Sequence, residues 1–221
     1  MEKSAVPYLS DALVVIRREL CLILLPTILT AALSLQRFFA PRPTFMVSGV
    51  MIIALVIVLP LIYGQYTEIV LNGKKDAWTA VFRAYWVRAF VLALILKAPI
   101  VLVMLWAPGA NALRGAMSFL IELLSIYIVP LVFVKKEIVS PIKIGLKDLL
   151  GNLKFSAPLI AAAGVSFLLP VLGSLLFRFV QNGIVIHAVR LVIVVICMVI
   201  DYSVFIAVLL ILKEKILSGQ E

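Results

Sequence analysis

The stretch that decides the fold is Asn72–Pro99, NGKKDAWTAVFRAYWVRAFVLALILKAP, in which an amphipathic segment runs directly into an apolar one. Four of its side chains follow the i, i+3, i+4, i+7 spacing of a single helix face: Trp78, Val81, Phe82 and Tyr85. Charged residues occupy the rest of that segment, which is typical of a helix that lies in a membrane interface. We therefore expect an interfacial helix, anchored by Trp78, Phe82 and Tyr85, that leads into a transmembrane span.

The composition is that of a membrane protein. Of the 221 residues, 64% are hydrophobic and 14% are charged, whereas soluble domains are about half apolar and about a quarter charged. At about 20 residues per span, the chain has room for about six helices and little else. We therefore expect a single membrane domain over residues 1–221, without an extramembrane catalytic domain.

Six apolar runs are expected to cross the bilayer, at residues 20–35, 44–63, 87–106, 116–134, 155–177 and 188–212. Amphipathic segments beginning at Ser10, Lys75 and Ser140 precede the first, third and fifth run, and their starts are 65 residues apart. The expected fold is thus an all-α, polytopic integral membrane bundle of six transmembrane and three interfacial helices. The spacing favours three repeats, at about residues 1–64, 65–134 and 135–221, although evenly sized hairpins would produce the same period without a repeat.

The lysines and arginines are distributed unevenly between the two sides of this bundle. With both termini on one side, that side carries fourteen of them and the other side carries five: Arg37, Arg42, Arg114, Arg178 and Arg190. Basic excess marks the cytoplasmic face, so we expect a multi-pass protein of a prokaryotic cytoplasmic (inner) membrane with both termini and the interfacial helices in the cytoplasm. The outer arginines are candidates to hold an anionic lipid or solute, because guanidinium suits phosphate, and simple anchoring to lipid phosphates would explain them as well.

Three ionisable residues lie inside the apolar runs: Lys97, Glu122 and Asp201. At 1.5 Å per residue, Lys97 lies about 13 Å beyond Arg88 and Asp201 about 16 Å beyond Arg190, so both are near mid-depth. An intramembrane charge is a functional candidate by default, because burying it in hydrocarbon costs several kcal/mol. Three interpretations remain open: an ion pair of Lys97 with Asp201 or Glu122, a proton or ion pathway, and a Lys97 side chain that snorkels to the interface.

Other sequence features restrict the chemistry. Neither His187 nor the two cysteines, Cys21 and Cys197, have partners at metal-ligand spacing, and no Gly-rich phosphate loop or nucleophile–base pair is recognisable, so we expect no metal, cofactor or catalytic residue. The lysines and arginines that give the chain its net charge of +9 lie beside apolar spans, so no nucleic-acid partner is expected. Small residues in the fifth run predict close helix packing: Gly164, Ser166, Gly173 and Ser174.

Two short patterns carry a resemblance to known proteins. One is YGQY at residues 63–66, followed by Gly73, Phe82 and Arg88; the other is KEIVSP at residues 136–141, followed by NLK at residues 152–154. The layout resembles six-helix bacterial and archaeal membrane proteins that are similar to the membrane domain fused to some glycerophosphodiester phosphodiesterases. The resemblance implies a membrane domain of that layout and assigns no catalytic residue, and these 221 residues contain no phosphodiesterase domain.

Together these features predict a non-enzymatic membrane protein that transports or binds a lipid-related or small anionic solute, or that serves as the membrane subunit of a complex. The expected partners are membrane lipids and, in a complex, a membrane or cytoplasmic subunit. An intramembrane enzyme acting on lipid headgroups and a pure membrane scaffold are the alternatives.

Overall fold

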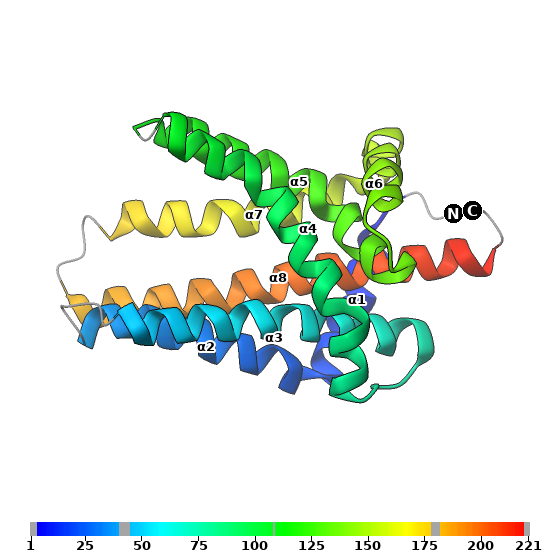
Figure 1. The fold of residues 1–221 in the computed structure, drawn as a ribbon, viewed down its shortest axis with the longest axis horizontal. Helices are drawn as coiled ribbons and strands as arrows, with labels where there is room; N and C mark the ends of the chain where they lie inside the picture. Colours follow the sequence, from blue (N-terminus) through cyan, green and yellow to red (C-terminus); the bar gives the residue numbers. More distant parts are fainter. Residues whose placement is uncertain (1–3, 40–44, 108, 178–181, 219–221) are drawn as a thin grey trace.

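The computed structural model describes residues 4–39, 45–107, 109–177 and 182–218. These residues form eight α-helices and no strand (Figure 1): α1 (Val6–Arg18), α2 (Leu20–Phe39), α3 (Phe45–Asn72), α4 (Trp78–Trp106), α5 (Asn111–Lys135), α6 (Val139–Gly151), α7 (Leu153–Leu176) and α8 (Gly183–Leu217). Five of them, α3, α4, α5, α7 and α8, are long and apolar enough to cross a membrane, which confirms a multi-pass helical membrane protein. A further apolar helix, α2, has described side chains over Leu20–Leu33.

The central helix is α8. Its second half, from Tyr202 to Leu212, is buried almost throughout, and the helix contacts α1, α2, α3, α5 and α7. A helix that is apolar on every side suits such a position. Its first half, residues 183–200, remains half-buried or exposed. The core of the protein therefore surrounds the second half of α8.

Both short helices lie at one end of the bundle, together with the last turns of α8; this end is called the base below (Figure 1). Lys215 of α8 pairs there with Asp148 of α6, with 2.9 Å between Nζ and Oδ2. The Tyr8 hydroxyl of α1 donates a hydrogen bond to the Glu214 carboxylate of α8. At the opposite end, called the hairpin end, α4 is followed by α5 and α7 by α8 (Figure 1).

The third helix continues past the predicted end of the second span, residue 63, through Asn72. Tyr66 and Val70, one and two turns after Ile62, are buried with it in the core. Packing on this face, rather than contact with lipid, therefore accounts for the last turns of α3.

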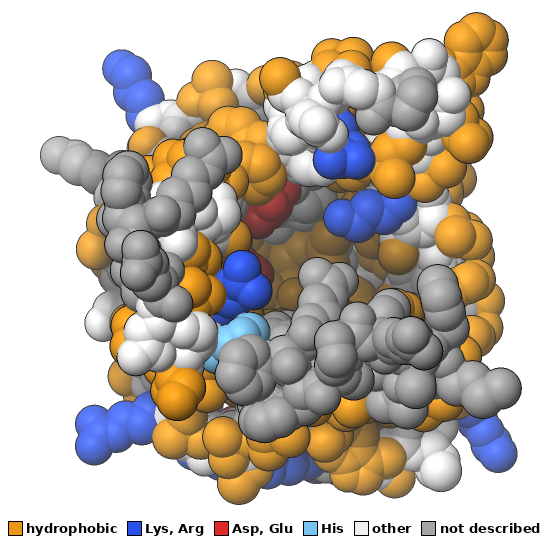
Figure 2. Space-filling model, turned by 90° about the vertical axis from the view of Figure 1, so that its left-hand side faces the viewer, with side chains coloured by type: hydrophobic (Ala, Val, Ile, Leu, Met, Phe, Trp, Pro, Cys, Tyr) orange, Lys and Arg blue, Asp and Glu red, His pale blue; other side chains and the backbone are white. Residues whose placement is uncertain are grey.

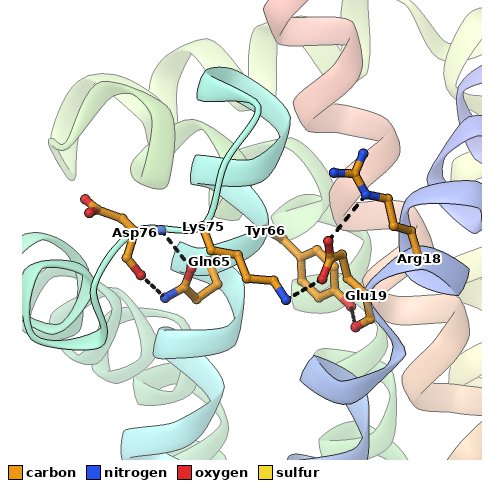
Figure 3. A network of polar contacts seen from close by, with 6 residues as sticks. All are labelled: Arg18, Glu19, Gln65, Tyr66, Lys75 and Asp76. Atoms are coloured by element: carbon orange, nitrogen blue, oxygen red, sulfur yellow. Dashed lines mark hydrogen bonds and ion pairs between the residues drawn. The ribbon is translucent and has the colours of Figure 1, made fainter.

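A network of polar contacts joins the end of α3 to the junction of α1 and α2 (Figure 3). The Glu19 carboxylate lies 2.5 Å from the Lys75 ammonium nitrogen, and the Tyr66 hydroxyl donates to the Glu19 carbonyl oxygen at 3.3 Å. The Gln65 side-chain amide donates to the Asp76 carbonyl oxygen at 2.8 Å, and its oxygen accepts from the Asp76 N–H at 3.3 Å. These contacts hold the segment between α3 and α4 against the base.

The predicted interfacial helices differ from one another in the structure. The first and third are separate helices, α1 and α6, whereas the second is the beginning of the continuous helix α4. The three helices start at Val6, Trp78 and Val139, so the even spacing of the sequence patterns does not extend to the helix boundaries.

The apolar face that opens α4 is divided between the core and the outside. Val81 and Tyr85 are 1% and 3% exposed, whereas Trp78 and Phe82 are 49% and 40% exposed. The reason is Gly64 of α3, where an added Cβ would lie 2.5 Å from Val81 Cγ1 and 2.7 Å from Tyr85 Cδ2. Tyr85 is therefore a core residue, which corrects its expected role as an interfacial anchor, and Trp78 and Phe82 keep surfaces suited to that role.

A second close approach places α6 on α5. A Cβ added to Gly145 would lie 2.9 Å from the backbone nitrogen of Ile128. Backbone atoms cannot rotate away as a side chain can, so a larger residue at position 145 must displace one of the two helices. Gly151, at the end of the same helix, has no atom within 4 Å of such a Cβ and offers a matched control.

We expect Gly145→Ala to destabilise the protein by about 1–3 kcal/mol, because added volume in a closely packed contact forces a backbone shift. Thermal unfolding of the purified protein in detergent measures the difference. Gly151→Ala should leave the midpoint unchanged or raise it slightly, because it reduces backbone freedom without a clash. Equal midpoints for the Gly145→Ala and Gly151→Ala proteins would contradict the close packing of α6 on α5.

Candidate functional site

A hollow opens between the helices at the hairpin end, and Figure 2 shows acidic and basic side chains gathered on its walls. Three adjoining cavities lie in this part of the bundle, with volumes of about 650, 180 and 530 Å³. Asp201 lines the first and the second cavity, and Glu122 and Tyr63 line the second and the third. Because they share lining residues, the three cavities are neighbours, and together they form one candidate site.

The first cavity lies between α2, α3, α7 and α8. Its polar lining includes Ser174 of α7 and Arg190, Cys197 and Asp201 of α8, and most of the remaining lining is apolar. The three α8 residues recur at i, i+7 and i+11, so they share one face of the helix. Asp201 directly precedes the buried half of α8, so its carboxylate lies where the packed core gives way to the cavity.

Ser166 of α7 holds the Asp201 carboxylate. Its hydroxyl donates to Oδ1 at 2.6 Å, and its own carbonyl oxygen accepts from the Cys197 thiol at 3.3 Å. Ser166 is 5% exposed, whereas Asp201 is half-buried. Of the small residues predicted to pack α7 closely, Gly173 does so, because an added Cβ would lie 2.5 Å from Ile193 of α8. Ser166 instead positions a charged group.

The second and third cavities bring the other intramembrane charges to the site. The second lies between α3, α5, α7 and α8 and is lined by both carboxylates, Glu122 and Asp201, together with Ser125. The third lies between α3, α4 and α5 and is lined by Lys97 and Glu122. The hairpin of α4 and α5 therefore contributes Glu122, which shares the second cavity with Asp201 of α8, and Lys97, which shares the third cavity with Glu122.

The three intramembrane charges gather without pairing directly. Within the described ranges, no ion pair joins Lys97 to Glu122 or to Asp201. Lys97 has an exposed side chain on the wall of the third cavity, and both Lys97 and Asp201 interact electrostatically with Glu122. The structure thus places the three residues on adjoining cavities and not in the close ion pair that was one interpretation of the sequence.

The predicted outer arginines do not form one cluster among the described residues. Arg42, Arg178 and the side chain of Arg37 lie outside the described part of the chain. Arg114 donates to the Asn111 side chain at 2.7 Å in the first turn of α5. Arg190 lines the first cavity, with its guanidinium carbon 5.0 Å from the centre of the Phe177 ring. Arg190 is therefore the described arginine that joins the site.

An aromatic cluster closes the site toward the base. Tyr63 packs against Phe133, Tyr202 and Phe205 with ring centres 6.0, 5.0 and 4.5 Å apart. Sequence reasoning missed the roles of Tyr63 and Ser166, because residue spacing indicates a helix face but not the helix that will lie against it. The sequence does contain a signal for the contact of Tyr63 with Phe133. These residues end two similar segments, PLIY at residues 60–63 and PLVF at residues 130–133.

The described side chains include no group of three or more His, Cys, Asp and Glu residues that could hold a metal ion. Comparisons with protein-family models, with curated proteins and with solved structures find no match for this chain. The chemistry of the cavities must therefore be judged from their own side chains.

We expect Cys197, in a Cys21→Ser background, to react with a small membrane-impermeant methanethiosulfonate added at the hairpin-end side of oriented vesicles. The reaction requires a thiolate, which forms where water reaches the sulfur. In a Cys21→Ser/Cys197→Ser background, Val208→Cys should stay unmodified, because position 208 is 0% exposed. If Cys197 reacts with the reagent from neither side of the membrane, the result contradicts a cavity that is open to water.

Proposed function

We propose that this chain is a six-span, non-enzymatic protein of a prokaryotic cytoplasmic membrane that binds and moves a lipid-related solute through the connected cavities. The observation that carries the proposal is the placement of Lys97, Glu122 and Asp201 on adjoining cavities at the middle of apolar helices, where Glu122 shares one cavity with Asp201 and another with Lys97. Charges in hydrocarbon cost several kcal/mol unless they are hydrated or paired, and they are usually kept where a function needs them.

The state of the carboxylates supports ligand binding rather than a purely structural role. A register-fixing ion pair would place its partners within salt-bridge distance, whereas Asp201 accepts one hydrogen bond from Ser166 and borders two cavities. An ionised carboxylate accepts about four hydrogen bonds. Asp201 therefore retains acceptor capacity for water or a solute.

The mixed lining favours an amphiphile over a small anion. A free anion entering the second cavity would meet two carboxylates, Glu122 and Asp201, which would repel it. Apolar side chains form most of the remaining walls and suit a hydrocarbon chain, as in most pockets that bind small organic ligands. Of the two solute classes that the sequence leaves open, the lipid-related one suits these walls better.

The proposed topology makes α2 the sixth span. At 1.5 Å per residue its 20 residues extend about 30 Å, the thickness of the hydrocarbon layer. The excess of lysine and arginine assigned to the base supports placing the base in the cytoplasm, with the hollow opening outward. This layout agrees with the resemblance to membrane domains fused to some glycerophosphodiester phosphodiesterases. The proposed function implies membrane lipids as partners.

We expect Asp201→Asn and Glu122→Gln to weaken retention of co-purified lipid about tenfold, the effect of losing one charge-assisted hydrogen bond of about 1.4 kcal/mol. Quantitative mass spectrometry of lipid bound to the purified protein measures this, and circular dichroism checks the fold. Lys74→Gln, an exposed lysine outside the cavities, is the control and should retain the wild-type amount.

Wild-type lipid content in folded Asp201→Asn and Glu122→Gln proteins would overturn the proposal and leave the charges as tolerated features. Conversion of the headgroup of added lipid would favour the alternative of an intramembrane enzyme, in which the same carboxylates act as acid and base. Purification of the protein with another chain in a fixed ratio and with no bound lipid would favour the alternative of a membrane scaffold.

A further inference from the structure

We infer that the first cavity receives a zwitterionic aminoalkyl phosphate group, with its ammonium at Asp201 and its phosphate toward Arg190. The inference rests on the proposed function and names the class of solute. Both residues belong to α8 and line the same cavity of about 650 Å³. The cavity is therefore polarised along α8, with a carboxylate at its inner end and a guanidinium toward the hairpin end.

The inner end suits a primary ammonium. Ser166 occupies Oδ1 of Asp201 at 2.6 Å and holds the carboxylate in place, while Oδ2 accepts no described hydrogen bond from the protein. Glu122 faces the adjoining cavity that Asp201 also lines, which adds a second negative charge near the same point. A primary ammonium supplies three N–H donors, so it can bind the free carboxylate oxygen directly. A quaternary ammonium lacks these donors.

The outer end suits a phosphate. Arg190 precedes Asp201 by three turns of α8, which places the two on one face about 16 Å apart along the axis. This separation favours a ligand with two separated charges over a single ion. The guanidinium lies over the Phe177 ring, and its remaining donors match the oxygens of a phosphate.

The opposite charges also explain selectivity. A purely anionic headgroup would leave the Asp201 carboxylate unpaired, and a purely cationic solute would leave the Arg190 guanidinium unpaired. Between them the wall is apolar, with Ile193, Val194 and Met198 of α8 among the lining residues. The same charged groups occur in a lipid, phosphatidylethanolamine, and in the free solute phosphoethanolamine, and binding measurements distinguish these two sources.

The test uses the full chain in detergent and native mass spectrometry, with four probes: phosphatidylethanolamine, phosphatidylcholine and phosphatidylglycerol of equal chain length, and free phosphoethanolamine. We expect phosphatidylethanolamine to bind about tenfold more tightly than either other lipid, the effect of one charge-assisted hydrogen bond. Tighter binding of free phosphoethanolamine than of phosphatidylethanolamine would identify the soluble compound as the ligand. Preference for either of these two probes supports the inference.

Variants separate the two ends of the site. Asp201→Asn keeps an oxygen for Ser166 but loses the charge, so it should remove the preference for phosphatidylethanolamine over phosphatidylcholine. Arg190→Gln should weaken both lipids alike, because both carry the phosphate. Arg114→Gln, at an arginine outside the cavities, should change neither affinity.

The outcomes distinguish this inference from the proposed function. Binding of phosphatidylglycerol or phosphatidylcholine in preference to phosphatidylethanolamine, still weakened by Asp201→Asn, would overturn the zwitterion and leave a lipid-binding protein. Equal binding of all four probes, unchanged in the folded Asp201→Asn and Arg190→Gln proteins, would overturn both.

Discussion

Hydrocarbon provides no hydrogen-bond partner, and this constraint governs every polar atom in the spans of this protein. The backbone satisfies it by forming helices, and several hydroxyl groups satisfy it within their own helix. Thr27, Thr67 and Ser203 donate to the carbonyl oxygens of Ile23, Tyr63 and Val199, at 2.8, 2.8 and 2.6 Å. Charged side chains that border cavities, and that do not pair directly with one another, are one departure from this constraint.

The molecule combines two kinds of interior. Toward the base, the second half of α8 is packed on all sides, and an ion pair to α6 and a hydrogen bond from α1 hold its end against the short helices. Toward the hairpin end, the same helix becomes one wall of a set of cavities. For the first cavity the boundary falls between Asp201, which lines the cavity, and Tyr202, which is fully buried in the core. Rigid support beneath the site holds the Asp201 carboxylate in a defined position, which a binding site requires.

Much of the architecture follows from the sequence, because hydrophobic runs report membrane spans directly. The runs at residues 87–106, 116–134, 155–177 and 188–212 lie within or nearly within α4, α5, α7 and α8. Helix faces are harder to assign, because periodicity does not say what covers a face. Tyr85 is buried because Gly64 lets α4 approach α3, a contact between residues of different helices. Likewise Lys97, Glu122 and Asp201 stand out individually, whereas the cavities that Glu122 shares with each of the other two depend on how α3, α4, α5, α7 and α8 are arranged.

The position of α8 in the chain has a consequence for assembly. During synthesis it emerges after the other seven described helices, yet it contacts five of them. Until it arrives, α1 and α7 lack the helix that each of them contacts most, and the Ser166 hydroxyl has no carboxylate to hold. The insertion of α8 therefore completes both the fold and the site.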